Sequence, residues 1–347
     1  MRIATAKQSY AADEAIFTTD TQRAWFAVLL AALVLYPFLA SGYWMFLAVL
    51  VMINVISTTG LNILTGYTGQ VSLGHAAFMA LGAYTVAFLD GRHDTPVLLN
   101  LLAAGGMAAG IGVLVGLPSL RIKGLYLAIA TLAASVILGF VFLNWTSVTG
   151  GIRGLNVPTA TILGFELATA ETLYWLVMPI TVLAVLLARN LFRTRVGRAF
   201  IAIRDRDISA EIIGISLLRY KLTSFALSSF YAGVAGGLWA YLFRVVRPES
   251  FPAEASIFYL AAVIVGGAGT ILGGILGATF MTLVPELLKL AAQLVTPWWA
   301  DASIYLAPIR LIVFGALIVG FLIFEPMGLA EVWRRVRRFF ALWPFRT

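Results

Sequence analysis

Long apolar runs are the feature that most constrains what this chain can fold into. A membrane-spanning helix needs roughly 20 predominantly apolar residues. Ten candidate runs recur, at 24–40, 44–59, 71–89, 97–117, 124–143, 172–188, 221–243, 257–266, 271–290 and 307–324. Because 61% of the 347 residues are hydrophobic and only 12% are charged, a soluble fold has too little interior to bury them. The sequence therefore predicts an all-α polytopic integral membrane protein with about ten transmembrane helices, some short or broken, and excludes a water-soluble enzyme.

Basic residues gather between the apolar runs and predict the orientation of the chain. The formal net charge is +8, but such clusters mark cytoplasmic membrane loops, so we expect the lipid bilayer and no nucleic acid as a partner. Ten spans place both termini and both large basic clusters in the cytoplasm. Residues 1–23 mix acidic and basic side chains, unlike a signal peptide. The expected division is a cytoplasmic tail (1–23), a first transmembrane half of six spans (24–188), a cytoplasmic coupling loop (189–220), a second transmembrane half of four spans (221–325) and a basic cytoplasmic tail (326–347).

The sequence shows no group of residues arranged for catalysis or for binding a metal ion. It has no cysteine, and its two histidines, His75 and His93, are too far apart for a His-x-x-x-His metal site. No Gly-x-x-x-x-Gly-Lys-Ser/Thr motif is present, so the chain cannot hydrolyse ATP by that route. No carboxylate stands in the middle of an apolar run, where proton-driven carriers usually bury one. We therefore expect a transport protein, not an enzyme, with no catalytic residue, metal ion or cofactor of its own.

Two glycine-rich interruptions predict the translocation pathway. Gly66–Gly69 and Gly266–Gly269 each sit early in one half of the chain and precede a helix rich in small residues. Interrupted segments at matching positions of inverted halves are typical of transport pathways, and here they suggest an inverted five-span repeat. Polar side chains concentrate around the first interruption, where each needs a partner or a water-lined path. The predicted pathway residues are Asn62, Gly66, Tyr67, Gly69, Gln70, Ser72, His75, Gly266, Gly267 and Gly269.

The segment 62–75 is expected to be partly non-helical and to face a central cavity. Ser72 and His75 are three residues apart, which predicts that they share one helical face. A second interpretation of His75 stays open, because a lone histidine between apolar helices is often a buried group that only hydrogen-bonds to its neighbours.

Pairs of glycines four residues apart predict close helix packing. They are Gly106 and Gly110, Gly112 and Gly116, Gly233 and Gly237, Gly269 and Gly273, and Gly273 and Gly277. Without a side chain, such positions let two helix backbones approach each other in lipid.

The basic segment at 197–215 contains a predicted short helix. Asp207 is a favourable N-cap and Gly214 a favourable C′ residue, so the helix is expected to run from Ile208 to Ile213. Ile208 and Ile212 form an apolar edge with charged flanks. Such a helix suits a groove on a partner protein, and it equally suits the membrane surface, where basic amphipathic helices often lie.

Three motifs resemble the LivM-type permease family of branched-chain amino acid ABC importers. The first is TGYTGQVSLGHAAFMALGAYT (65–85). The second is GRAFIAIRDRDISAEIIGI (197–215), followed by YKL (220–222) and AGVAGGLWA (232–240). The third is VGGAGTILGG (265–274). The family's last span usually ends in a basic Arg-Pro-Arg-Gly type sequence, and here Glu325 and Met327 depart from it while Pro326, Gly328 and Leu329 agree.

The resemblance implies an import function and a set of partners. It implies a permease subunit that carries amino acids, with branched-chain ones expected, in the bacterial inner membrane. A second, LivH-like permease, two ATPase subunits that bind ATP, and an extracytoplasmic binding protein would complete the importer. It also implies that 197–215, hereafter the coupling segment, contacts the ATPase. The coupling residues expected on this basis are Arg198, Ala199, Arg204, Ile208, Glu211, Ile212 and Gly214.

The residues alone also allow a transporter or channel that works without an ATPase. Unwound carbonyls near either glycine-rich interruption would suit sodium coupling of a secondary transporter for a small polar solute. Transport by the chain without ATP would favour that alternative.

Overall fold

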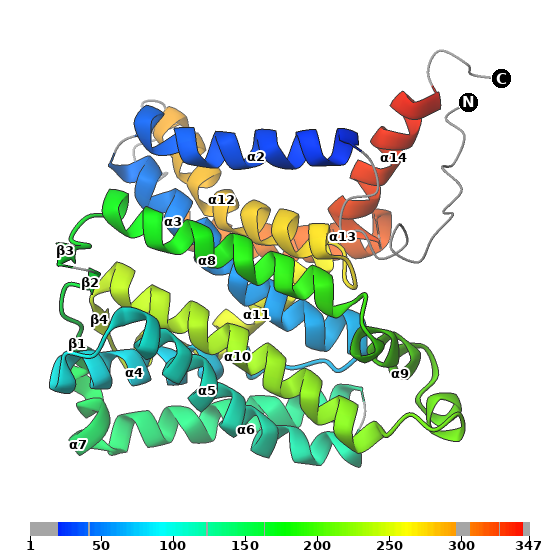
Figure 1. Ribbon diagram of the computed structural model, residues 1–347, viewed down its shortest axis with the longest axis horizontal. Helices are drawn as coiled ribbons and strands as arrows, with labels where there is room; N and C mark the ends of the chain where they lie inside the picture. Colours follow the sequence, from blue (N-terminus) through cyan, green and yellow to red (C-terminus); the bar gives the residue numbers. More distant parts are fainter. Residues whose placement is uncertain are drawn as a thin grey trace.

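The computed structural model describes residues 20–40, 42–122, 124–162, 164–295, 306–325 and 327–342. Helices dominate this part of the chain (Figure 1). The helices of the first half are α2 (Asp20–Leu39), α3 (Tyr43–Asn62), the π-helix η1 (Ile63–Tyr67), α4 (His75–His93), α5 (Val97–Gly116), the 3₁₀ helix η2 (Leu117–Leu120), α6 (Leu125–Asn144), α7 (Thr146–Thr149) and the 3₁₀ helix η3 (Gly151–Arg153). Those of the second half are α8 (Ala170–Leu191), α9 (Arg195–Ile212), α10 (Leu217–Phe243), the 3₁₀ helix η4 (Pro248–Ser250), α11 (Ala253–Gly266), α12 (Ile271–Val295), α13 (Leu306–Phe324) and α14 (Gly328–Leu342).

Four two-residue strands form two small antiparallel ladders. Strand β1 (Leu155–Asn156) pairs with β4 (Val245–Val246), and β2 (Thr161–Ile162) pairs with β3 (Phe165–Glu166). Figure 1 shows the strands at one end of the molecule, with α9 and α14 at the opposite end. The ladders therefore belong to the connections between long helices and not to the helical core.

The all-α membrane fold is confirmed, while the count of ten spans is not. Seven segments of the described chain are long and apolar enough to cross a membrane: Tyr43–Tyr67, Val97–Gly116, Leu125–Asn144, Ala170–Leu191, Leu217–Phe243, Pro248–Gly266 and Ile271–Leu290. The first apolar run is shorter, at Arg23–Leu39. Every predicted apolar run nevertheless coincides with a helix, apart from residues 71–74 before α4, because an apolar segment in lipid must satisfy its own backbone hydrogen bonds.

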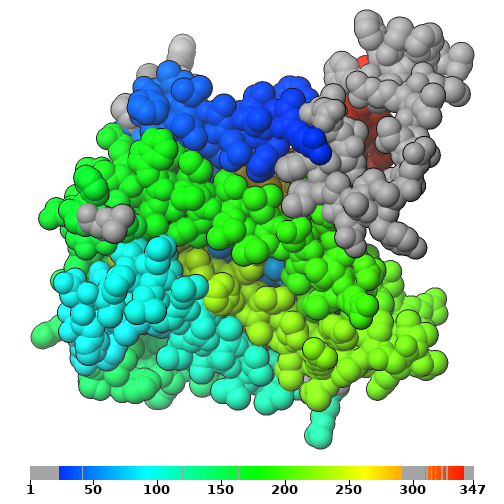
Figure 2. All heavy atoms as spheres, viewed as in Figure 1, coloured from blue at the N-terminus to red at the C-terminus, as the bar shows by residue number. Residues whose placement is uncertain are grey.

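Helix α10 forms the centre of the bundle. It packs against α3, α4 and α5, and α3 packs in turn against α8 and α12. The α3 span is 83% buried and the α10 span 72% buried, whereas the other five candidate spans are at most 44% buried. Figure 2 shows α8, in green, covering one face between α2 and the α4–α5 pair. The two core helices are thus enclosed by protein, and the outer helices leave apolar surface for lipid or partner subunits.

Only some of the glycine pairs serve helix packing within this chain. A Cβ added at Gly233 would overlap the Ala104 carbonyl, and one added at Gly112 would overlap Ser229. Gly106 and Gly110, by contrast, have no atom within 4 Å of such a Cβ. The prediction of close packing is therefore confirmed where α5 meets α10, whereas Gly106 and Gly110 lie on the open face of α5 and contact no other helix of the described chain.

The segment predicted as a basic cytoplasmic tail contains a helix. The predicted tail 326–347 contains α14, which crosses the long helices at a steep angle (Figure 1). Glu325, the residue that departs from the family pattern, accepts two hydrogen bonds from Arg335, at 2.9 and 3.1 Å. Trp333 and Val336 are exposed on the apolar side of α14. The basic residues of this segment thus belong to an amphipathic helix.

Candidate functional site

The two glycine-rich interruptions lie against each other in the fold. Asn62, the last residue of α3, donates to the Thr270 carbonyl at 2.7 Å and accepts from the Gly269 amide at 2.9 Å. A Cβ at Gly66 would overlap both the Asn62 side chain and the Gly269 backbone. Only glycine at position 66 therefore allows this approach. We call this contact, made by Asn62, Gly66, Gly269 and Thr270, the glycine junction.

The backbone around the first interruption is irregular, as expected. Helix α3 continues into the π-helix η1, and residues 69–74 are not helical. Single π-helical turns are rare in proteins, and those that occur are often found at functional sites. Gly69 has φ of +73°, a conformation that L side chains rarely adopt. The break thus comes from the π-turn followed by a left-handed glycine.

Arg204 of the coupling segment reaches the glycine junction. Its Nη1 donates to the Gly66 carbonyl at 3.1 Å, and its side chain lies against Gly69 and Gly269. The guanidinium also pairs with Asp205 at 3.2 Å. The structure therefore joins one predicted coupling residue directly to predicted pathway residues from both halves of the chain.

Gln70 is held between the junction and α10. Gln70 is 5% exposed, and its backbone N–H donates to the Leu64 carbonyl at 3.1 Å. Its side-chain Nε2 donates to Ser224 Oγ at 2.8 Å. Its Oε1 is buried without a hydrogen-bond partner within the described chain. Tyr67 is buried nearby and stacks on Phe192.

His75 and Ser72 are buried but do not share a helical face. Helix α4 begins at His75, so the predicted pairing on one helix is wrong. Ser72 lies before the helix, where its Oγ accepts from the Gly74 amide at 3.3 Å. The His75 Nε2 lies 2.9 Å from Ser57 Oγ and 3.0 Å from the Ser57 carbonyl, with Tyr259 edge-on to its ring. These contacts fit the interpretation of His75 as a hydrogen-bonded buried group.

The other two predicted glycines serve neighbouring contacts. A Cβ at Gly266 would overlap the Gly273 carbonyl of α12. Gly267 has φ of +115° and lies against Met327 and Ala330, next to the start of α14. Among the three glycines predicted in the second half, Gly269 is part of the glycine junction, and the Gly267 carbonyl accepts a hydrogen bond from Thr270 Oγ1 at 2.9 Å.

The coupling segment is a helix with a break in it. Helix α9 starts at Arg195, with the Thr194 hydroxyl as its N-cap, and is interrupted at Arg206, whose φ and ψ are −157° and 98°. The non-helical residue is thus Arg206, one position before the predicted cap at Asp207. The kink separates a first part, in which Ala199 is 5% exposed, from the short helix predicted from the sequence. Arg198 is exposed and donates to the Arg193 carbonyl at 3.1 Å.

Gly214 ends α9 as the sequence predicts. It has φ of +90°, its amide donates to the Glu211 carbonyl at 3.0 Å, and the Ile215 amide donates to the Ala210 carbonyl at 2.9 Å. This is the Schellman pattern of a glycine C′ residue. Ile208 and Ile212 are 67% and 80% exposed, so the apolar edge is uncovered in the isolated chain.

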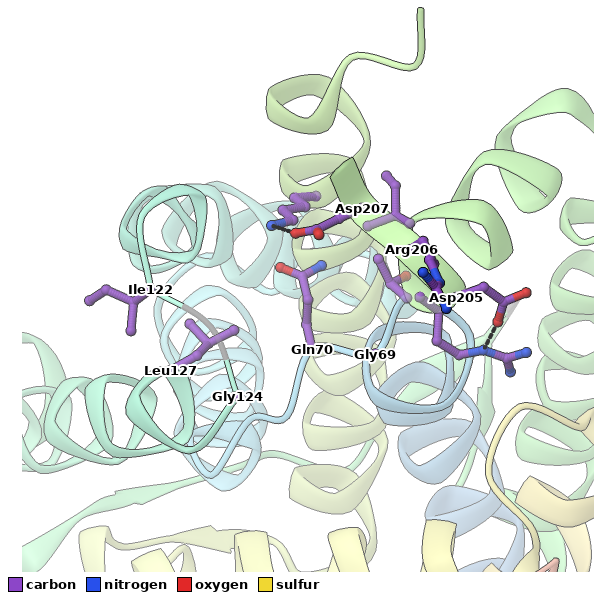
Figure 3. A pocket seen from close by; sticks show the side chains of 12 residues that line it. Gly69, Gln70, Ile122, Gly124, Leu127, Asp205, Arg206 and Asp207 are labelled. Atoms are coloured by element: carbon purple, nitrogen blue, oxygen red, sulfur yellow. Dashed lines mark hydrogen bonds and ion pairs between the residues drawn. The ribbon is translucent and has the colours of Figure 1, made fainter. Parts of the chain in front are cut away.

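A cavity of about 200 Å³ lies where pathway and coupling residues meet. Figure 3 shows Gln70 pointing towards Asp207, with Ile122 and Leu127 on one side and Asp205 and Arg206 on the other. Its lining is Thr68, Gly69, Gln70, Ile122, Gly124, Leu127, Ile203, Arg204, Asp205, Arg206, Asp207 and Lys221.

Sequence reasoning did not single out Lys221 and Ser224. Lys221 is 4% exposed, and its Nζ lies 3.8 Å from Asp207, immediately after the kink. Ser224 Oγ donates to the Lys221 carbonyl at 2.8 Å. A lysine within an apolar helix is itself a signal for a functional position, but the basic residues around it made it look like part of a loop.

No group of three or more potential metal-binding His, Cys, Asp or Glu residues occurs in the part of the chain that the structure describes. The polar groups of the cavity are a lysine, an amide, arginines and carboxylates in mixed order. Such a set can bind and orient a small polar molecule, and it offers no paired nucleophile and base.

Comparison with known proteins identifies relatives of this chain. Residues 43–322 match the family described as branched-chain amino acid transport system / permease component. The chain is 34% identical to the high-affinity branched-chain amino acid transport system permease protein LivM of Escherichia coli, over 91% of this chain and 77% of that protein. Its identity to the LivM of Salmonella typhimurium is 32% over the same shares. It is 26% identical to the autoinducer 2 import system permease protein LsrC of the same species, over 78% of this chain and 73% of LsrC. No solved structure matches.

Proposed function

The chain belongs to the permease family of branched-chain amino acid transport systems, and from that premise we propose how it works in an ATP-driven importer. The chain is the permease component of such an ABC transport system, a membrane protein and not an enzyme. Aliphatic amino acids are its proposed cargo, handed over by an extracytoplasmic binding protein. Membership of this family favours ATP-driven import over the ATPase-independent transporter or channel that the residues alone allow.

We propose that a LivH-like second permease and two ATPase subunits complete the importer. ATP would bind to the ATPase subunits, and this chain would bind no cofactor. The open face of α5 at Gly106 and Gly110 is available to another helix, because no atom of the described residues lies within 4 Å of a Cβ added at either glycine. That face suits the second permease.

We propose that the end with α9 and α14 faces the cytoplasm of a bacterial inner membrane. The start of α2, α9 and α14 all lie at this end of the bundle (Figure 1). Arginines are concentrated on α9 and α14, and basic segments are retained on the cytoplasmic side. The four strands then lie on the side of the binding protein.

The observation that carries the mechanism is the hydrogen bond from Arg204 to the Gly66 carbonyl. Residues Ile208 and Ile212, on the same helix, expose an apolar edge at the proposed cytoplasmic surface. If the ATPase covers this edge, a movement of α9 acts on the glycine junction without an intervening helix. Binding and hydrolysis of ATP would thereby shift the permease between two states of alternating access.

Substitution of Gly214 tests the role of the coupling segment. Gly214 has φ of +90° and no atom within 4 Å of an added Cβ, so Gly214→Val strains the backbone without a clash. The strain is about 1–3 kcal/mol. Gly164 of the β2–β3 connection also has a positive φ, +83°, and open space, so Gly164→Val is the matched control at the opposite end.

The assay is the complete importer in proteoliposomes, scored for uptake and for ATP hydrolysis stimulated by the loaded binding protein. We expect Gly214→Val, and independently Glu211→Lys, to insert normally and to reduce the amino acid carried per ATP hydrolysed. Gly164→Val should keep that ratio. Full stimulated hydrolysis and normal uptake in both coupling variants would show that the segment is not the ATPase contact and would favour its location on the membrane surface.

A further inference from the structure

The cavity at the kink of α9 combines a polar wall with an apolar wall. Thr68, Gly69 and Gln70 enter it from the first glycine interruption, and residues 203–207 enter from the coupling segment. Its volume of about 200 Å³ is below the roughly 300–1,000 Å³ of pockets for drug-sized ligands. Only a small molecule can be enclosed there.

The free acceptor at the polar wall is fixed by its neighbours. Ser224 uses its single hydroxyl proton for the Lys221 carbonyl, so its oxygen must accept from Gln70. The amide NH₂ of Gln70 therefore faces Ser224, and its Oε1 is left buried without a partner in the described chain. A buried acceptor without a donor is unfavourable by about 1–3 kcal/mol. A ligand that donates a hydrogen bond there would remove this cost.

The same wall carries both signs of charge. The Lys221 ammonium forms an ion pair with the Asp207 carboxylate at 3.8 Å. Arg204 and Arg206 add two further cations to the lining, and Asp205 adds a second carboxylate. A ligand with one carboxylate and one ammonium would find a partner for each. A ligand with only one charge could form an ion pair with only one of these two groups.

The apolar wall consists of aliphatic side chains. Leu127 is 2% exposed and Ile203 is 4% exposed, and Ile122 lies beside Leu127 in Figure 3. An aliphatic group buried against them is favoured by about 25 cal/mol per Å² of apolar surface removed from water. A long charged side chain would meet no partner on this wall.

We propose that this cavity is a cytoplasmic binding site for a free aliphatic amino acid. Lys221 would receive the carboxylate, and Gln70 and Asp207 would receive the ammonium. Ile122, Leu127 and Ile203 would enclose the side chain. The proposal rests on the proposed function for its choice of an amino acid and for the cytoplasmic side, and it assigns a site that the import function does not by itself require.

Occupancy of the site has a consequence for transport. Gln70 belongs to the glycine-junction side of the cavity, while Asp207 follows the kink of α9. A ligand that bridges the two stabilises this arrangement of pathway and coupling segment relative to any other. A high cytoplasmic concentration of the amino acid therefore slows the cycle, because more permeases stay in the liganded state.

The experiment uses the complete importer in proteoliposomes with the ATPase side outward and the loaded binding protein inside. Stimulated ATP hydrolysis is measured while L-leucine is added outside. We expect inhibition by L-leucine. We expect none from 4-methylpentanoate, which lacks the ammonium, from 3-methylbutylamine, which lacks the carboxylate, or from L-lysine, which has no partner on the apolar wall.

Two variants of different chemistry test the same site. Gln70→Leu removes the free acceptor, and Leu127→Phe fills the cavity while leaving its polar groups. Each should raise the half-inhibitory leucine concentration at least tenfold relative to its own uninhibited activity. Lys289→Met is the matched control for Lys221→Met, because Lys289 is half-exposed on α12 and does not line the cavity. Lys221→Met should abolish the inhibition and Lys289→Met should not change it.

Equilibrium binding of radiolabelled leucine to the chain in lipid nanodiscs separates this proposal from the proposed function. An importer that takes up leucine normally but shows neither inhibition nor binding on the ATPase side would overturn the site alone. Unchanged inhibition in both Gln70→Leu and Leu127→Phe would also overturn it. An importer that transports no amino acid would refute the proposed function, and the binding measurement would still decide the site.

Discussion

Replacing Asn62 by alanine should loosen the contact between the two halves of the chain. The Asn62 side chain accepts from the Gly269 amide and donates to the Thr270 carbonyl, 207 and 208 residues away in sequence. Alanine can make neither bond. The Gly66 turn then loses the side chain that ties it to the α11–α12 connection.

The size of the effect follows from those two bonds. Each intramolecular hydrogen bond contributes about 0.5–1.5 kcal/mol net, and a fully buried group left without a partner costs about 1–3 kcal/mol. Gly269 and Thr270 are half-buried, so water can replace part of what is lost. We expect Asn62→Ala to lower the free energy of unfolding by about 1–3 kcal/mol. For a chain of this size that corresponds to about 1–4 °C in melting temperature.

The assay is thermal unfolding of the detergent-solubilised chain, paired with uptake by the reconstituted importer. The control is Asn144→Ala, since Asn144 is exposed and its side chain donates to the Phe140 carbonyl one turn earlier in its own helix, at 2.8 Å. Asn62→Ala should melt below the control and take up less amino acid. If the two variants melt together and transport equally, Asn62 does not hold the glycine junction.

Two further predictions concern packing and surface charge. Gly233→Ala should destabilise the chain by about 1–3 kcal/mol because its Cβ would overlap the Ala104 carbonyl. Gly110→Ala, in open space on α5, should be neutral or stabilising by up to about 1 kcal/mol, and the reverse order in thermal melts of the isolated chain would contradict the assigned helix faces. Glu325→Gln removes the negative charge and one of the two oxygens that accept from Arg335, but Arg335 is 65% exposed, so melts at low and high salt should show a loss below about 1 kcal/mol.

Much of the architecture could be predicted from local sequence. Each apolar run coincides with a helix over most of its length, Gly214 ends α9, and the segment after Asn62 is irregular. Such features depend on residues within one or two turns: the length of an apolar run, a left-handed glycine, a π-turn. The error at Ser72 has the same origin, since a spacing of three implies a shared face only if the helix has already begun, and α4 begins at His75.

The number of membrane spans could not be predicted from the apolar runs alone. Helix α4, a predicted span, is not among the seven segments that meet both length and composition. It ends in Asp90, Arg92 and His93, which extend the helix beyond its apolar run. Hydropathy locates a helix, but its ends are set by capping and by contacts with neighbouring helices.

The sequence by itself determined the membrane fold, the basic segments and the family motifs, because hydropathy, charge and motif spacing are read along the chain. Only the tertiary structure decided that Arg204 meets Gly66 and that Gln70 has a free acceptor beside Lys221. These contacts join residues about 140 to 150 positions apart. They depend on how each helix is rotated about its axis and where it crosses its neighbours, and packing of all the helices together fixes both.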